Sequence, residues 1–121
     1  SAEPANLEAR LELAVAEKAL LQEKLLQDFT AQLETAKTAL EILDSLLILA
    51  EKGNPNAISD CGVATYMVEA AVRGAILNVK INLKEISDKM FNKKMEDECK
   101  NIENILKKKT EKIEELVQSK L

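Results

Sequence analysis

Residues 53–83 read GNPNAISDCGVATYMVEAAVRGAILNVKINL, and this stretch decides how the chain folds. Gly53 can take the left-handed position that follows a helix, and Pro55 cannot continue one, so the pair marks the end of a preceding helix. Ser59 has the side chain of a helix N-cap, and Asp60 suits the positive end of a helix dipole. The stretch therefore predicts a turn and then a helix over about 59–83.

Amphipathic helices are predicted on both sides of this stretch. Residues 5–52 contain neither glycine nor proline. Apolar residues recur there in steps of three and four, which is the period of a helix packed on other helices. Ser87 is the expected N-cap of a last helix over about 88–120. The residues of that helix expected to face inward are Phe91, Met95, Cys99, Ile102, Leu106, Ile113 and Val117.

The length of the first helix raises a conflict. One helix over 5–51 would measure about 70 Å, whereas a compact domain of this size has a diameter of about 35 Å. Either the helix breaks near 28–32 or a second subunit covers the excess, and we expect a kinked helix pair together with a partner chain. The expected fold is all-α: an antiparallel bundle of three or four long helices, completed by dimerisation, in a single helical domain over 1–121.

Composition excludes several classes of function. The net charge of −4 and the presence of only one Tyr and two Phe argue against a nucleic-acid partner, which needs basic and aromatic surfaces. The absence of histidine removes the usual general base and the commonest zinc ligand, and no metal is expected. Cys61 and Cys99 are expected to be reduced thiols of a cytoplasmic protein. No apolar run reaches the ~18 residues that span a membrane.

The helix over 59–83 carries small and polar residues on one face. The residues of that face are Asp60, Ala64, Met67, Ala71, Gly74, Asn78 and Asn82. Arg73, with Glu69 and Lys80, lies opposite, on the expected solvent side. Because Gly74 costs a mid-helix position about 1 kcal/mol against alanine, a close neighbour is expected to offset it.

Two interpretations of this face stay open, and they do not exclude each other. In the structural one, small residues let helices cross closely. In the functional one, a carboxylate and two amides converge on a bound molecule. Asn54 and Asn56 are first explained by the turn, since asparagine bonds its own backbone there. A nucleophilic role for Cys61 is disfavoured, because no histidine can serve as its base.

The segments GNPNAISDCGVA and EAAVRGAILNVKINLKEI resemble the cyclodeaminase domain of formiminotransferase-cyclodeaminase and its methenyltetrahydrofolate cyclohydrolase relatives. The upstream segment LLQEKLLQDFTAQLETAKTALEILDSLLILAEKGN is similar in length and pattern to the helix before that motif. The resemblance implies an all-helical, dimer-forming, cytoplasmic domain of folate metabolism. It would act on a tetrahydrofolate derivative without a metal, as a cyclodeaminase (a lyase) or a cyclohydrolase (a hydrolase).

The resemblance also implies site residues and shows departures from the family. Asp60 and Asn78 are expected to be catalytic. The expected substrate-binding residues are Asn54, Asn56, Ser59, Arg73 and Asn82. The family's glycine-rich opening segment is absent, so the chain is expected to be the C-terminal part of a larger domain and to be inactive alone if that segment forms part of the site. Many relatives carry proline where this chain has Gln32. The alternative function is a non-catalytic helical dimerisation or assembly module.

Overall fold

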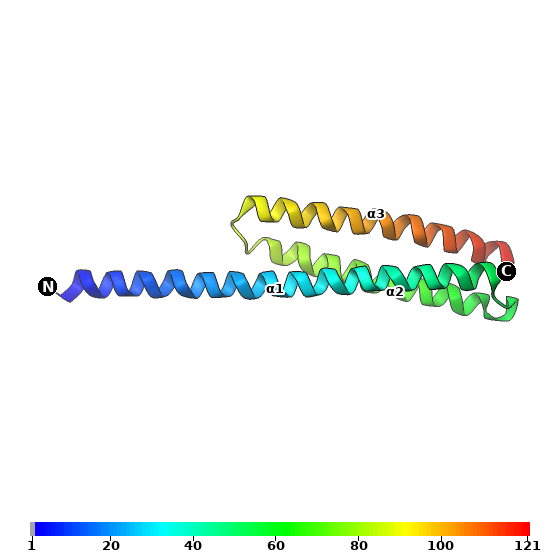
Figure 1. Ribbon diagram of the computed structural model, residues 1–121, viewed down its shortest axis with the longest axis horizontal. Coiled ribbons are helices and arrows are strands. Elements are labelled where there is room, and N and C mark those ends of the chain that lie inside the picture. The colour runs from blue at the N-terminus through cyan, green and yellow to red at the C-terminus, as the bar shows by residue number, and fades with distance from the viewer. Residues whose placement is uncertain (1) are drawn as a thin grey trace. The chain divides into compact units, whose positions relative to one another are not determined.

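The computed structural model describes residues 2–121, with side chains from residue 5 onward. Figure 1 shows the elements in the order α1 (Ala2–Lys52), the short 3₁₀ helix η1 (Pro55–Ala57), α2 (Ile58–Leu83) and α3 (Lys89–Lys120). No strand occurs in this part of the chain. The prediction of an all-α fold is confirmed, and dimerisation stays a prediction.

Helix α1 is continuous through residues 28–32, so the expected break there is wrong. The physical reason lies in the composition of the helix. With neither glycine nor proline after residue 4, every residue can keep its hydrogen bond to the carbonyl four positions earlier. Gln32, unlike a proline at this position, leaves that hydrogen-bond ladder intact.

The chain nevertheless divides into two compact units, Ser1–Ala31 and Gln32–Leu121. In the first unit every side chain from residue 5 to residue 21 is exposed. Six large apolar side chains there are more than half exposed: Leu7, Leu11, Leu13, Val15, Leu20 and Leu21. The candidate site lies entirely in the second unit.

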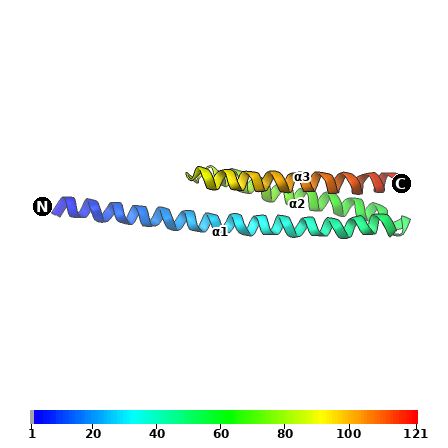
Figure 2. The ribbon, with the colours of Figure 1, turned by 45° about the horizontal axis from the view of Figure 1, so that its top comes forward.

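The second unit is an antiparallel arrangement of the end of α1, all of α2 and all of α3. Figures 1 and 2 show from two directions that α2 returns along the end of α1 and that α3 returns along α2. The core residues come from all three helices. They include Leu33, Ala36, Leu40, Leu43, Leu46 and Ala50 of α1, Val72, Ile76 and Val79 of α2, and Met95, Cys99, Ile102, Leu106, Ile113 and Val117 of α3. Each large aliphatic side chain buried in this way contributes about 1.5–3 kcal/mol.

Three lysines connect the helices at the surface of this unit. The Lys120 ammonium donates to the carbonyl oxygens of Ala50 and Glu51, the latter at 3.0 Å, and so caps the C-terminal end of α1 from the last turn of α3. Lys109 Nζ lies 2.7 Å from Asp44 Oδ1 of α1. Lys80 Nζ of α2 lies 2.8 Å from Glu103 Oε1 of α3.

The helix starts differ from the sequence predictions by one or two residues. Helix α2 begins at Ile58 after Ala57, whose side chain can make no cap hydrogen bond, so Ser59 is not the N-cap. Helix α3 is capped by Asp88, which accepts from the amides of Met90 and Phe91, and not by Ser87. In both places a serine of the right type lies next to the true boundary. A cap is fixed by where the chain turns, and residue type alone does not fix it.

Candidate functional site

A cavity of about 340 Å³ lies where α1 ends and α2 begins. Its walls come from three consecutive pieces of the chain: the last turns of α1, the connection containing η1, and the first two turns of α2. The lining residues are Leu46, Leu49, Gly53, Asn54, Ala57, Asp60, Cys61 and Ala64. Two of the predicted site residues, Asn54 and Asp60, are among them. The cavity therefore combines an apolar wall from α1 with polar groups from the motif that the sequence singles out.

Gly53 allows the sharp turn at the base of the cavity. Its amide donates to the carbonyl oxygen of Leu49 at 2.6 Å, and a Cβ atom placed on it would lie 2.2 Å from that oxygen. No glycine in the described residues has a positive φ, so the expected left-handed conformation of Gly53 is wrong. Glycine is needed here because backbone approaches backbone too closely for any side chain.

Asn54 organises the connection that follows. Its Oδ1 accepts a hydrogen bond from the amide of Asn56 at 2.9 Å, and its carbonyl oxygen accepts one from Ala57 at 2.9 Å. These bonds form η1 and set the direction in which α2 starts. The backbone explanation of Asn54 is thus correct, although its position in the cavity wall leaves the amide Nδ2 group able to contact a ligand.

Cys61 forms the inner wall of the cavity. Its Sγ–H group donates to the carbonyl oxygen of Leu46 at 3.2 Å, and its side chain is buried. Burial raises the pKa of the Cys61 thiol above its ordinary value, so the thiol stays protonated at neutral pH. A protonated, hydrogen-bonded thiol is a poor nucleophile, and this agrees with the sequence argument against nucleophilic catalysis.

Asp60 has the only acidic side chain among the lining residues of this cavity. It lies in the first turn of α2 and is exposed, and the N-terminus of that helix has no side-chain cap. Acidic side chains are common in the first turn of a helix, where they face the positive end of the helix dipole. The arrangement can attract a cationic group, or accept and return a proton, at the mouth of a largely apolar cavity.

The other predicted site residues do not line this cavity. Asn56 and Ser59 are exposed beside it, in the turn and in the first turn of α2. Asn78 is eighteen residues beyond Asp60 on the same helix, which corresponds to roughly 27 Å, and Asn82 is farther still. The expected convergence of a carboxylate and two amides therefore does not occur within one chain.

Arg73 lies away from the cavity. Its Nε donates to Glu69 Oε1 at 3.1 Å, one turn earlier on α2, as expected from their spacing. This flank of α2 faces α3, whereas the cavity lies on the flank that faces α1. The structure gives Arg73 no contact with the candidate site.

The small-residue face of α2 is open in this chain. No atom lies within 4 Å of a Cβ placed on Gly74, and the Met67 side chain is 69% exposed. The close neighbour expected to offset the cost of Gly74 is therefore absent from the described residues. Sequence reasoning also passed over Gly53, Leu46 and Leu49 as parts of the site. Gly53 could have been found, because it opens the quoted motif.

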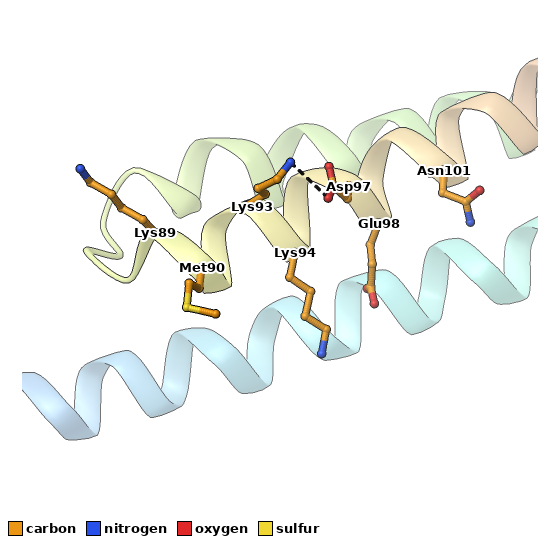
Figure 3. Close-up of a pocket in the computed structure, with 7 residues that line it drawn as sticks. All are labelled: Lys89, Met90, Lys93, Lys94, Asp97, Glu98 and Asn101. Atoms are coloured by element: carbon orange, nitrogen blue, oxygen red, sulfur yellow. Dashed lines mark ion pairs between the residues drawn. The ribbon is translucent and has the colours of Figure 1, made fainter.

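A larger hollow of about 710 Å³ lies on the first turns of α3. Figure 3 shows its lining side chains, all from that one helix: Lys89, Met90, Lys93, Lys94, Asp97, Glu98 and Asn101. Lys93 pairs with Asp97 at 3.5 Å, and both side chains are largely exposed. None of the predicted site residues is here. The smaller junction cavity is therefore the candidate site.

No three His, Cys, Asp or Glu side chains among the described residues gather closely enough to hold a metal ion. No helix among them is both long and apolar enough to cross a membrane. The expectation that no metal takes part stays a prediction.

Comparisons with known proteins place this motif in a family. Residues 8–101 match the family described as formiminotransferase-cyclodeaminase. A methenyltetrahydrofolate cyclohydrolase from Methylorubrum extorquens is 38% identical over 109 residues, which are 88% of this chain and 51% of that protein. A formimidoyltransferase-cyclodeaminase from Rattus norvegicus is 40% identical over 74 residues, 61% of this chain and 14% of that protein.

The Gallus gallus formimidoyltransferase-cyclodeaminase is 53% identical over 47 residues, 39% of this chain and 9% of that protein. This chain thus spans about half of the bacterial relative and a smaller share of the vertebrate ones. No solved structure matches it. The extent of the family match, together with the motif that forms the junction cavity, shows that the chain belongs to the formiminotransferase-cyclodeaminase family.

Proposed function

We propose that this chain is part of a folate one-carbon enzyme and that the junction cavity receives the reacting end of a tetrahydrofolate derivative. Family membership supports the substrate class, and the position of Asp60 in the cavity wall supports the location. The volume of about 340 Å³ is at the low end of the ~300–1,000 Å³ typical of small-molecule sites. The cavity would therefore enclose one end of the substrate and leave the rest outside.

Two reactions fit the cavity, and both involve a positively charged one-carbon centre. In methenyltetrahydrofolate hydrolysis, water adds to the methenyl carbon, loses a proton, and one carbon–nitrogen bond opens to leave a formyl group. In the cyclodeaminase reaction, a ring-closing nitrogen attacks the formimino carbon and ammonia leaves. Asp60 would serve both by pairing with the cation and by moving the proton.

The apolar wall of the cavity, opposite Asp60, would also favour reaction at a cationic carbon. Leu46, which is buried, would exclude water from one side of the reacting carbon, and this would strengthen the interaction of Asp60 with a cationic centre. The Asn54 amide would orient the substrate. We place hydrolysis first, because the cyclohydrolase relative matches 88% of this chain whereas the Rattus norvegicus protein matches 61%. A cytoplasmic location stays a prediction.

Folate binding to the intact chain and two variants tests this proposal. A stable reduced folate, 5-formyltetrahydrofolate, should raise the melting temperature of the parent, and 5,10-methenyltetrahydrofolate should be hydrolysed faster than in buffer. Asp60→Asn should reduce both effects. Asp97→Asn, an exposed aspartate in the hollow on α3, is the matched control and should change neither. The proposal fails if Asp60→Asn behaves like the parent, or if neither this chain nor its longer natural form binds folate.

The second candidate function is a non-catalytic helical assembly module. The open face of α2 favours it, because an apolar face of that length is usually covered. It predicts self-association that is independent of folate, together with no folate-induced change in melting temperature.

A further inference from the structure

The last turn of α3 lies beside the junction between α1 and α2. Figures 1 and 2 show from two directions that α3 ends next to the end of α1 and the start of α2. Two residues there, Val117 and Lys120, contact the junction. Neither lines the cavity, whose walls come from α1, the connection and α2. Any effect of these two residues on the candidate site must therefore act through the residues that they touch.

Lys120 holds the end of α1, which forms one wall of the cavity. The last four carbonyl groups of a helix have no partner inside that helix. The carbonyl oxygen of Leu49 accepts from the amide of Gly53 at 2.6 Å. Those of Ala50 and Glu51 accept from the Lys120 ammonium, the latter at 3.0 Å. One charged group thus fixes two carbonyls that lie in the chain between Leu49 and Gly53, both of which line the cavity.

Val117 holds the start of α2, which forms the opposite wall. Its side chain is buried, and a Cβ atom placed on Gly62 would lie 3.3 Å from its Cγ1 atom. The valine therefore packs directly against the backbone of α2 at the position after Cys61, which forms the inner wall of the cavity. Cys61 in turn joins the two walls, because its thiol donates to the carbonyl oxygen of Leu46 at 3.2 Å.

The two walls need support from outside the cavity. A thiol is a weak hydrogen-bond donor, so the bond from Cys61 to Leu46 holds them together only weakly. The connection between the walls, residues 53–57, buries no side chain and adds little packing. Lys120, by contrast, has a charged donor, and such donors form hydrogen bonds roughly twice as strong as neutral ones. The spacing of the walls therefore depends on α3.

We propose that Val117 and Lys120, here called the α3 clamp, are positioning residues of the junction site, because they hold its α1 wall and its α2 wall at the spacing that lets Asn54 and Asp60 contact one ligand. Loss of the clamp lets the end of α1 move away from the start of α2 and widens the cavity. A displacement of about 1 Å is enough to weaken a site whose polar groups must reach the same molecule. The effect on folate binding rests on the proposed function.

Alkylation of the two native cysteines measures the α3 clamp without folate. Both thiols are free and buried, Cys61 at the junction and Cys99 in the core between α2 and α3. Global unfolding exposes both thiols alike, whereas local opening of the junction exposes Cys61 alone. Iodoacetamide is uncharged, so a change of charge on the protein has little effect on its approach. Mass spectrometry gives both rates in one sample, and the ratio of the Cys61 rate to the Cys99 rate reports on junction opening.

Lysine variants test the α1 side of the clamp. Lys120→Met should raise this ratio about fivefold, the factor that corresponds to a loss of about 1 kcal/mol of hydrogen bonding. Lys120→Arg keeps a charged donor and should keep the ratio of the parent. Lys109→Met is the matched control, because Lys109 also joins α3 to α1, through Asp44, but about three turns earlier on α3. An unchanged ratio in Lys120→Met, or an equal rise in Lys109→Met, overturns the proposal.

Valine variants test the α2 side of the clamp. Val117→Ala removes both methyl groups that pack near Gly62 and should also raise the ratio. Val79→Ala is the matched control, since it makes the same deletion at another buried position, toward the far end of α2. Both variants should melt at lower temperature than the parent, because each leaves a cavity in the core. Equal rises of the ratio in the two variants would show general loosening and contradict a local clamp.

Binding of 5-formyltetrahydrofolate tests the effect of the clamp on the site. Calorimetry, well below the melting temperature of every variant, should show that Lys120→Met raises the dissociation constant about fivefold. Lys120→Arg and Lys109→Met should bind like the parent. Unchanged binding by Lys120→Met, with the cysteine ratio raised, refutes the positioning role. Absence of binding by the parent refutes the proposed function, and the cysteine ratio then decides by itself whether the clamp holds the junction.

Discussion

Replacement of Gly53 by alanine gives a direct measure of how tightly the junction is built. The added Cβ would lie 2.2 Å from the carbonyl oxygen of Leu49, whereas ordinary contacts begin at 3.4 Å, so the backbone must move by about 1 Å. Such overpacking costs about 1–3 kcal/mol, and weakening the 2.6 Å hydrogen bond between the same residues adds about 1 kcal/mol. Gly53→Ala should therefore lower the free energy of unfolding by about 2–4 kcal/mol.

Urea unfolding followed by circular dichroism measures this loss. Protein concentration is kept low so that self-association does not contribute. Gly74→Ala is the matched control: nothing lies within 4 Å of its Cβ, so in a single chain it should raise the free energy of unfolding by about 1 kcal/mol. The two substitutions should thus have opposite signs. A Gly53→Ala protein as stable as the parent, or one stabilised like Gly74→Ala, would refute the close approach at the junction.

Three further predictions concern stability. Asn54→Ala removes the hydrogen bond to the Asn56 amide and should cost about 0.5–2 kcal/mol in the same urea assay, with a matching loss of helix near η1. Lys80 Nζ and Glu103 Oε1 are 2.8 Å apart but substantially exposed, so a double-mutant cycle should give a coupling below about 1 kcal/mol that shrinks with added salt. Burial raises the pKa of the Cys61 thiol above its ordinary 9.0, so stability should be full below that pH and fall as the pH rises through the folded-state pKa. Cys61→Ala should make that alkaline loss smaller, and an unchanged pH profile would contradict the stated cause.

The buried faces of the helices could be predicted from sequence, because their apolar residues recur with the period of the α-helix. On α3, every residue expected to face inward from Met95 to Val117 is buried, and Phe91 is half-buried. The burial of Thr110 was not predicted, because threonine is a polar residue. In the structure its hydroxyl donates to the Lys107 carbonyl oxygen at 3.2 Å, which lets the rest of the side chain lie in the core.

The site was only partly predictable. The motif around Asn54 and Asp60 indicated the junction, but a 3.6-residue wheel grouped Asp60 with Gly74 and Asn78 on one face. The wheel could not indicate Leu46 and Leu49, because these lining residues lie on α1 and not on α2. Asp60 and Asn78 are roughly 27 Å apart along a straight helix, so a single chain cannot bring these two side chains together.

Chemical-shift mapping of folate binding tests most directly whether the junction between α1 and α2 holds the site. Titration with 5-formyltetrahydrofolate should shift the backbone amide signals of residues 53–64, a segment that contains most of the lining residues of the cavity. Shifts confined to the first turns of α3, or no shifts at all, would contradict the location of the site at the junction.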